Sequence, residues 1–430
     1  MTATESSPLE AEPVTLETLE TLAAPRSKFH LVTNPKELAV SIDHLASTPG
    51  PVAVDAERAS GFKYSQRAYL VQLKTEHSDI FLIDPTTDSS LVDSHEFSQL
   101  REFLSDREWI LHAATQDIPC LEELGLHPKA IFDTELAGRL TGQPRVGLGS
   151  LVESLLQIGL AKEHSAADWS TRPLPESWLN YAALDVELLH QLRTSLQQLL
   201  EAQGKSEWAN QEFENLLSFK PKPAKQDRWR GISGLSKVSD QLSLEVARQL
   251  WLGREELAIK LDVSPGRLIP DASILAVAIA KPNTRPELAS LRSFNGRASR
   301  SYLDLWWDAL QSALKATVLP PVRAEKTEGI PNHRNWAAKY PEADRRLRHA
   351  KNALTQISEK ANVPLENLLT PDFLRQICFA PPEPATLESV SQTLTGFGAR
   401  RWQVDLTANA ITDSITRLDE PDQKPQSPQE

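Results

Sequence analysis

Patterns typical of β-strands occur only in the first half of this 430-residue chain. Apolar runs of strand length that end in turn residues are VAVDAE (52–57), YLVQLKT (69–75) and DIFLIDP (79–85). Beyond residue 205 no such run returns, and apolar residues recur at helical spacing instead. These patterns exclude an all-β or an all-α chain. They predict an α/β domain, with a mixed central sheet flanked by helices, followed by all-α domains.

Strands and helices are expected to alternate within the first domain. FHLVTNP (29–35) and WILHAA (109–114) are predicted as further strands. Helical spacing of apolar residues predicts helices at 36–45, 97–104, 116–124, 132–140, 148–160 and, as one long element, 178–203.

Length and local composition divide the chain into segments, since about 150 residues per domain gives three domains. The expected segments are a disordered acidic tail (1–29), the α/β domain (30–205), a Lys- and Pro-containing linker (206–225), two helical domains (226–318 and 319–415) and a second disordered tail (416–430).

No segment approaches the ~20 apolar residues that a membrane span requires. The acidic N-terminus lacks the apolar core of a secretory signal. Two distant cysteines, Cys120 and Cys378, argue against a disulfide scaffold or a structural zinc site. We therefore expect a protein of the reducing cytoplasm, with no membrane partner.

The two helical domains look like copies of one unit. KLDVSPGRLIP (260–270) aligns with KANVPLENLLT (360–370), and apolar, proline and glycine positions continue to match at an offset of 100 residues. Each unit is predicted as helix, short loop, helix, Pro-marked turn and helix. The shared spacing favours duplication over chance.

Charge is segregated along the chain, although the net charge is −12. Residues 30–205 contain 14 basic and 25 acidic side chains, whereas residues 222–320 contain 15 basic and 10 acidic ones. Acids can gather around divalent metals, and a basic module can hold a polyanion. Two differently solvated domain surfaces are the alternative explanation.

The most informative stretch is VAVDAE, because it places two carboxylates in an apolar strand. Side chains alternate along a strand, so Asp55 and Glu57 point to the same face. Like charges side by side in a buried position are costly. Either the strand emerges into solvent at this point, or cations hold the pair.

Two further carboxylates are expected on helices, one at the start of a short helix and one on the face of a longer helix. Asp117, in TQDIPCLEELG, is predicted in the first turn of a short helix, where a carboxylate also serves as a cap. Tyr181 and Asp185 are four residues apart and share one helical face. Considered singly, Asp117 is explained by capping and Tyr181 by half-buried packing.

Taken together, these four carboxylates and the tyrosine, in this order on strand, helix and helix, resemble the DEDD superfamily of 3′–5′ exonucleases, and the YxxxD form resembles its tyrosine subgroup. LHAATQDIPCLEELG (111–125), IFDTELAGRLTG (131–142) and ADWSTRPL (167–174) narrow the resemblance to ribonuclease D. QLWLGREELAIKLDVSPGRLIPDASILAVA (249–278) resembles the HRDC domain of helicases and ribonuclease D. The resemblance covers residues from about 30 to 415. It implies a ribonuclease H-like exonuclease domain followed by two HRDC-like domains.

The resemblance also implies an activity, a metal-dependent 3′–5′ exoribonuclease that releases nucleoside 5′-monophosphates. Asp55, Glu57, Asp117 and Asp185 would hold two divalent ions, Mg²⁺ or Mn²⁺, because hard cations prefer oxygen ligands. Two such ions can stabilise the attacking and leaving oxygens at phosphorus. Tyr181 would orient the attacking water and help to take its proton. The implied partner is RNA with a free 3′ end, above all tRNA precursors.

The first motif departs from the family, which often has DTEF where this chain has DAER (55–58). The metal ligands are intact, but Arg58 replaces an aromatic residue beside them. Contacts with the terminal nucleotide are therefore in doubt, and Arg58 is a candidate for holding phosphate. His112 and Arg172 are further candidates, with a core histidine and a loop-anchoring ion pair as the respective alternatives.

The basic helical module is a second candidate RNA-binding region. Its arginines Arg228 and Arg230 fit non-specific phosphate binding. Trp229 lies between them and could stack on a base, with core packing as its alternative.

Two other functions compete with exoribonuclease activity. A DNA 3′–5′ exonuclease on the same fold is disfavoured because no polymerase follows in this chain and paired HRDC-like repeats do. A catalytically inactive RNA-binding protein would require a lost ligand, and all four carboxylates are present. A monomer is expected, because the helical repeats cover much of the surface.

Overall fold

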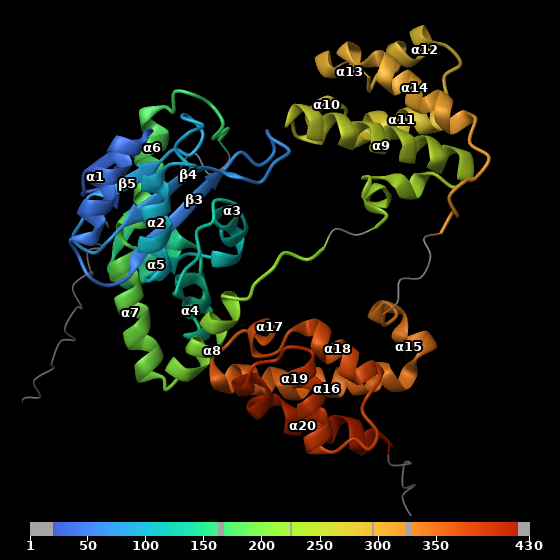
Figure 1. Ribbon diagram of the computed structural model, residues 1–430. Helices are drawn as coiled ribbons and strands as arrows, with labels where there is room; N and C mark the ends of the chain where they lie inside the picture. The colour runs from blue at the N-terminus through green and yellow to red at the C-terminus, as the bar shows by residue number, and fades with distance from the viewer. Residues whose placement is uncertain (1–19, 162–166, 224–225, 295, 324–328, 420–430) are drawn as a thin grey trace, which may run out of the picture.

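The structure is a computed structural model that describes residues 20–161, 167–223, 226–294, 296–323 and 329–419. In order along the described chain come the α/β domain, the first helical domain and the second helical domain (Figure 1). The α/β domain followed by helical domains confirms the fold class expected from the sequence.

A six-stranded mixed sheet forms the centre of the α/β domain. Its strands, in spatial order, are β2 (Phe29–Val32), β5 (Ile80–Ile83), β4 (Ala68–Lys74), β3 (Val52–Arg58), β6 (Glu108–Leu111) and β7 (Ala130–Asp133). β4 runs antiparallel to both β3 and β5, and the other pairs are parallel. Since β3 is flanked by β4 and β6, its first three residues are fully buried.

Within the described residues, eight α-helices accompany this sheet: α1 (Pro35–Ala46), α2 (His95–Ser105), α3 (Ile118–Glu123), α4 (Thr134–Leu140), α5 (Leu148–Leu156), α6 (Glu176–Glu187), α7 (Leu189–Ala202) and α8 (Ser206–Leu216). α6 packs across β3, β4 and β5. Ala182 and Ala183 are fully buried, and these small side chains let the helix approach the sheet closely.

Three expected helices in this domain have different boundaries. The helix expected at 132–140 begins at Thr134, because Asp133 ends strand β7 and accepts the backbone N–H groups of Glu135 and Leu136 as the helix cap. The helix expected at 148–160 ends at Leu156, where Gln157 adopts a φ of 58°. The long helix expected at 178–203 is divided at Leu188 into α6 and α7.

The α/β domain also extends beyond both of its expected ends. Residues 206–216, expected in the linker, form α8, which buries Ala209, Phe213 and Leu216 against the domain core. Part of the expected acidic tail forms β1 (Glu20–Leu22), which pairs in parallel with β8 (Ile158–Leu160). Amphipathic spacing in α8 and a buried Leu22 in β1 supply the apolar burial that fixes these segments.

The first helical domain has its own apolar core, with Phe294 and Trp306 fully buried. Its α-helices are α9 (Gln241–Leu261), α10 (Pro265–Leu268), α11 (Asp271–Ala280), α12 (Arg285–Ser290), α13 (Arg297–Ser301) and α14 (Leu303–Leu314), after the 3₁₀ turns η2 (Arg228–Gly231) and η3 (Leu235–Lys237).

The second helical domain repeats this plan. After η4 (His333–Asn335) its helices are α15 (Trp336–Lys339), α16 (Pro341–Ala361), α17 (Leu365–Leu368), α18 (Pro371–Phe379), α19 (Leu387–Gly396) and α20 (Arg401–Asp419). The helices α16, α17 and α18 begin 100 residues after α9, α10 and α11. This offset matches the duplication read from the sequence.

Both helical domains contact the α/β domain through the same corner of the repeat. We call the residues that end α9 and α16, Asp262 and Asn362, the docking corners. Both have left-handed backbones, with φ of 48° and 49°, a conformation that Asp and Asn adopt more readily than most residues.

The first docking corner binds the loop between β3 and β4. The Asp262 carboxylate accepts the backbone N–H of Ser65 at 2.8 Å and the hydroxyl of Tyr69 at 3.4 Å. Nearby, Ser264 donates its backbone N–H to the Phe62 carbonyl, and the Arg267 guanidinium lies 4.0 Å over the Phe62 ring.

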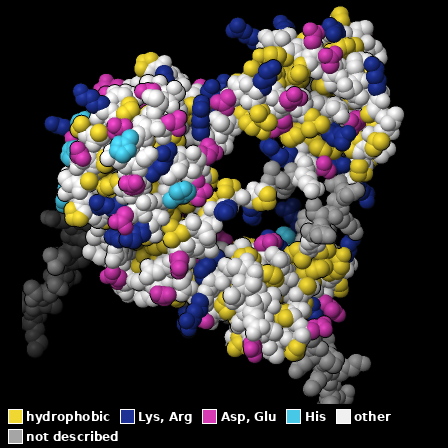
Figure 2. Space-filling model, viewed as in Figure 1, with side chains coloured by type: hydrophobic (Ala, Val, Ile, Leu, Met, Phe, Trp, Pro, Cys, Tyr) yellow, Lys and Arg dark blue, Asp and Glu magenta, His cyan; other side chains and the backbone are white. Residues whose placement is uncertain are grey.

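The second docking corner binds the opposite end of the α/β domain. Asn362 donates its amide to the Thr141 carbonyl at 3.3 Å and accepts the Lys205 ammonium group at its own carbonyl at 3.2 Å. Trp402 stacks on Trp208 with ring centroids 4.9 Å apart, and donates its indole N–H to Glu212. With both corners docked, the three domains surround an opening, which Figure 2 shows between them.

No helix within the described ranges is both long enough and apolar enough to cross a membrane.

Candidate active site

Strand β3 supplies the first two carboxylates. Asp55 and Glu57 lie two residues apart on the same face, opposite Gln72 and Leu70 of β4. The strand is buried from Val52 to Val54, whereas Asp55, Glu57 and Arg58 are partly exposed and Ala56 is buried. A register shift between Glu57 and Arg58 bends the strand at the end of this motif. The strand therefore emerges from the core where its carboxylates begin.

Asp117 is placed by an irregular turn after β6. Ala113 adopts a left-handed φ of 59°, a 3₁₀ turn η1 (Ala114–Gln116) follows, and Asp117 precedes α3. The buried Asp133 carboxylate accepts the backbone N–H groups of Ala113 and Ala114, and so holds the turn. Asp117 makes no side-chain cap hydrogen bond to α3, so capping does not account for its carboxylate.

Helix α6 supplies Tyr181 and Asp185 from one face. The two side chains are hydrogen-bonded to each other, as expected for positions four apart. Because α6 crosses β3, this face meets the carboxylates of the strand. The Trp169 ring centroid lies 6.4 Å from that of Tyr181, so Trp169 packs the preceding loop against the helix.

Three carboxylates converge where these elements meet. Asp55, Glu57 and Asp185 each offer an oxygen atom, and these oxygens lie within 4.8 Å of one another. They line a cavity of about 340 Å³ together with Asp117 and Tyr181. All five residues expected from the motifs therefore share one cavity. Asp117 stands outside the group of three, but its charge raises the pKa of Glu57 and of Asp185.

The cavity disfavours negative charge. Burial raises the pKa of Asp55 to about 6, with small opposing effects from the Ala56 N–H and Arg58. Burial, and then the charge of Asp55, raises the pKa of Asp117 to about 8. The same causes raise the pKa values of Glu57 and Asp185. Without a cation, the site therefore retains protons near neutral pH.

Tyr181 retains its proton for the same reason. Burial first, and then the charges of Asp185, Glu57 and Asp55, raise the pKa of its hydroxyl above the ordinary value. The hydroxyl can therefore donate a hydrogen bond within the cavity.

Arg58 also lines this cavity and is its only described cation. Within the described ranges its guanidinium has no hydrogen bond and no ion pair within 4.0 Å, yet its charge lowers the pKa values of Asp55, Glu57 and Asp117. An arginine placed in a pocket without a fixed partner has donors available for an anionic ligand.

His112 lines the cavity but is neutral. Its Nδ1 is 2.9 Å from the Thr134 hydroxyl, and burial lowers its pKa to about 4. A neutral imidazole can offer a hydrogen bond, but no positive charge, to phosphate. Ser60 and Gln116 line the same cavity and were not expected from the sequence; their position beside two of the acidic motifs was the available signal.

Arg172 does not reach the cavity. Its guanidinium forms an ion pair with Asp84 at 2.6 Å and donates to the Tyr69 and Trp169 carbonyls. The expectation that Arg172 contacts phosphate is thus replaced by its alternative, an anchor for the loop before α6.

Trp229, Arg228 and Arg230 already contact other residues of the protein. The Trp229 side chain is only 4% exposed, donates its indole N–H to Asp227, and is covered by the Arg230 guanidinium at 4.3 Å. A buried indole has no free face for a base, so the stacking expected of Trp229 is not available. Arg230 pairs with Asp227, whereas Arg228 is half-exposed and lies 3.6 Å from Glu255.

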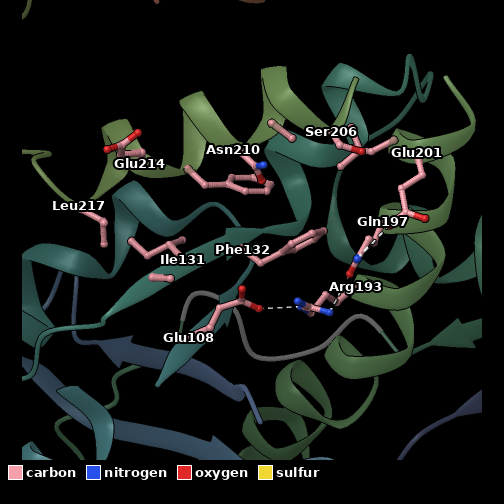
Figure 3. Close-up of a pocket in the computed structure, with 14 residues that line it drawn as sticks. Glu108, Ile131, Phe132, Arg193, Gln197, Glu201, Ser206, Asn210, Glu214 and Leu217 are labelled. Carbon is pink, nitrogen blue, oxygen red and sulfur yellow. Dashed lines mark hydrogen bonds and ion pairs between the residues drawn. The ribbon is translucent and has the colours of Figure 1, made fainter. Parts of the chain in front are cut away.

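A larger cavity, of about 580 Å³, lies elsewhere, between β7, α7 and α8 (Figure 3). Its floor contains Phe132 and Phe213, with ring centroids 4.8 Å apart. Arg193 crosses it and pairs with Glu108 at 2.7 Å and with Gln197 at 2.9 Å. Among the described residues no group of three converging metal ligands lies here. Size alone therefore does not identify the active site.

Comparison with known proteins assigns the domains. Residues 29–201 match the family model of a 3′–5′ exonuclease, and residues 243–310 match the HRDC domain. Residues 329–415 match a 3′ to 5′ exonuclease C-terminal domain.

Curated relatives and solved structures agree with these matches. The ribonuclease D of Sphingobium indicum is 29% identical over 273 residues, which is 62% of this chain and 68% of the relative. That of Desulfotalea psychrophila is 30% identical over 258 residues, 58% of this chain and 67% of the relative.

A crystal structure of a protein from Bifidobacterium adolescentis is 36% identical, with a TM-score of 0.84 over 93% of this chain and 100% of that one. Escherichia coli RNase D shares the fold at 23% identity, with a TM-score of 0.63 over 91% of this chain and 99% of that one. The chain therefore belongs to the ribonuclease D family of 3′–5′ exoribonucleases.

Proposed function

We propose that this exoribonuclease hydrolyses RNA one nucleotide at a time with two divalent cations, Mg²⁺ or Mn²⁺, in the 340 Å³ cavity. The observation that carries the proposal is the convergence of Asp55, Glu57 and Asp185, whose oxygens lie within 4.8 Å. Asp117 completes the ligand set from the same cavity. The products are nucleoside 5′-monophosphates.

The residues fit such cations on two grounds. All four side chains offer only oxygen, the ligand atom that Mg²⁺ and Mn²⁺ prefer. Burial raises the pKa values of all four carboxyl groups, and neighbouring carboxylates raise those of Glu57, Asp117 and Asp185 further, so their ionised forms are unfavourable in this cavity by themselves. A bound cation would offset that charge, and proton release would accompany its binding.

The protein's own residues then position the reactants. When bound, the cations would supply Lewis acidity at phosphorus and a more acidic attacking water. Tyr181 donates its hydroxyl hydrogen to Asp185, which fixes the ring. Its hydroxyl oxygen would then orient that water by accepting a hydrogen bond from it. Arg58 holds a phosphate oxygen of the terminal nucleotide, because its donors have no fixed partner among the described residues.

The substrate we propose is a tRNA precursor with a 3′ trailer. A trailer is a single strand attached to a folded body, and the opening between the three domains is the path that we propose for such a strand (Figure 2). The first helical domain adds positive charge, which favours contact with the phosphate backbone. The E. coli RNase D structure is described as that of an exoribonuclease involved in structured RNA processing, which agrees with this proposal.

We further propose a cytoplasmic monomer. The two helical domains dock on the α/β domain and cover part of its surface. Cys120 and Cys378 are both free and buried, as suits a reducing compartment.

A digestion assay tests the function directly. The full-length protein is mixed with a 5′-labelled tRNA precursor carrying a 3′ trailer, in Mg²⁺, in Mn²⁺ and in EDTA. The expected result is a ladder that shortens from the 3′ end, requires the cation and stops near the mature end. Single-stranded DNA of matched trailer sequence runs alongside.

The matched control is Asp185→Ala, which removes one of the three converging carboxylates. It should bind the precursor but leave it uncut. Cleavage by this variant, or in EDTA, would refute the metal mechanism. Faster cleavage of DNA than of RNA would refute the proposed substrate, and a ladder that passes the mature end unhindered would refute its restriction to tRNA trailers.

A further inference from the structure

Gln72 is a buried amide without a partner. Its side chain is 0% exposed, and neither Nε2 nor Oε1 has a hydrogen bond among the residues that the structure describes. Buried amides are nearly always hydrogen-bonded, because leaving both atoms unpaired is costly. An apolar side chain of similar volume would fill the same space without that cost.

The position of Gln72 connects it to the candidate metal ligands. It is the residue of β4 directly opposite Asp55 of β3, so their side chains emerge on the same face of the sheet as neighbours. Helix α6, which contributes Asp185, packs across both strands. The unpaired amide therefore lies under the helix and beside the carboxylate cluster.

The neighbours of Gln72 on this face rule out a general polar layer. Leu70 is apolar and fully buried, and Leu82 is the paired residue of β5. Lys74, the other polar residue, is already bonded, since its ammonium group donates to the Ser78 carbonyl at 2.9 Å. Among the described residues of β4, Gln72 is therefore the only polar side chain on this face that has no hydrogen bond.

We propose that Gln72 is a positioning residue of the metal site, whose Nε2–H group donates to the Asp55 carboxylate when that carboxylate holds a cation. The inference rests on the proposed function, because it assumes that Asp55 is a ligand. A hydrogen bond from the side selects one orientation of the carboxylate and leaves the other oxygen free for the cation. Such outer partners of metal ligands change metal affinity about 10–100-fold when they are removed.

The experiment measures Mn²⁺ binding, by isothermal titration calorimetry on the full-length protein stripped with EDTA. Gln72→Leu should bind Mn²⁺ about 10–100-fold more weakly than the unchanged protein. Its melting temperature in EDTA should be equal or higher, since the substitution removes a buried amide that has no partner. Gln72→Met, which keeps the unbranched shape, should behave in the same way if Leu perturbs packing.

A matched control is Gln403→Leu in the second helical domain. Gln403 is also fully buried, but its amide is satisfied: Nε2 donates to the Asn367 carbonyl at 2.7 Å and Oε1 accepts the Arg400 N–H at 3.0 Å. This variant should lower the melting temperature and leave Mn²⁺ affinity unchanged. The two glutamines thus give opposite patterns in the two measurements.

The outcomes separate this inference from the function on which it rests. If the unchanged protein binds Mn²⁺ and Asp55→Asn does not, the metal site stands. Equal Mn²⁺ affinity in Gln72→Leu, Gln72→Met and the unchanged protein would then overturn the positioning role alone. A lower melting temperature in both Gln72 variants with unchanged affinity would assign Gln72 a purely structural role. Absence of Mn²⁺ binding by the unchanged protein would instead overturn the proposed function.

Discussion

Asp55→Asn should remove cleavage and, in the absence of metal, stabilise the α/β domain. The two side chains have nearly the same shape, but only the carboxyl group can ionise. Asp55 stands in the cluster where four acids lie in a cavity of about 340 Å³. Without cations, these buried acids should lower the free energy of unfolding, and this substitution measures the contribution of Asp55 to that loss.

The magnitude follows from the shift in pKa. Burial raises the pKa of Asp55 from the ordinary value of 3.8 to about 6. One pKa unit corresponds to about 1.36 kcal/mol, so a charged Asp55 costs the folded state about 3 kcal/mol at pH 8. Between these two pKa values the folded state binds more protons than the unfolded state. Stability is therefore lost as the pH rises from about 4 to above 6.

The assay is amide hydrogen exchange of β3 and β4 in a urea series, with EDTA present. At pH 8 Asp55→Asn should exceed the unchanged protein by about 3 kcal/mol in the free energy of unfolding. At pH 4 the difference should fall below about 1 kcal/mol, because both side chains are then largely neutral. Adding Mg²⁺ at pH 8 should stabilise the unchanged protein only. An equal or lower stability of Asp55→Asn at pH 8 would refute the reasoning.

Three other substitutions test separate parts of the structure. Asp133→Ala removes the carboxylate that accepts four backbone N–H groups and should cost at least about 2 kcal/mol in chemical denaturation; no loss would mean that the turn before Asp117 is held otherwise. Gly142→Ala places a methyl group against the Asn362 side-chain amide and should release the second helical domain, seen as a larger radius of gyration in X-ray scattering. Gly204→Ala, at a left-handed position with open space around it, should not. Arg58→Ala should raise KM for RNA about tenfold with little change in kcat, and an unchanged KM would exclude the phosphate contact.

Local patterns predicted the fold class well. The strands β3, β4 and β5 are short apolar runs bounded by turn residues, and the sequence contains that signal directly. The 100-residue offset of α9 and α16 was equally visible, because duplication preserves spacing after individual residues have changed. The convergence of Asp55, Glu57 and Asp185 followed from the strand period of two and the helical spacing of four, combined with the family resemblance.

Other features depend on tertiary contacts that no local pattern contains. Segment 206–216 has an amphipathic spacing, but its polar composition suits a linker, and its packing on β7 is a tertiary contact that this composition does not indicate. Trp229 sits between two arginines in the sequence, yet the helical core buries it. The burial of Gln72 is not evident from the sequence, because a single polar residue in YLVQLK is typical of an outward position. Its significance depends on the register that sets it opposite Asp55.

The loop after β3 has a mechanical consequence. Glu57 and Gly61 are four residues apart, and at Gly61 and Phe62 the chain is already bonded to the first helical domain through Arg267 and Ser264. A force applied to that domain, for example by a taut RNA strand, is transmitted along this short tether into the strand that presents the carboxylates. A displacement of the first helical domain is therefore passed through a few residues of backbone to the strand that presents Asp55 and Glu57.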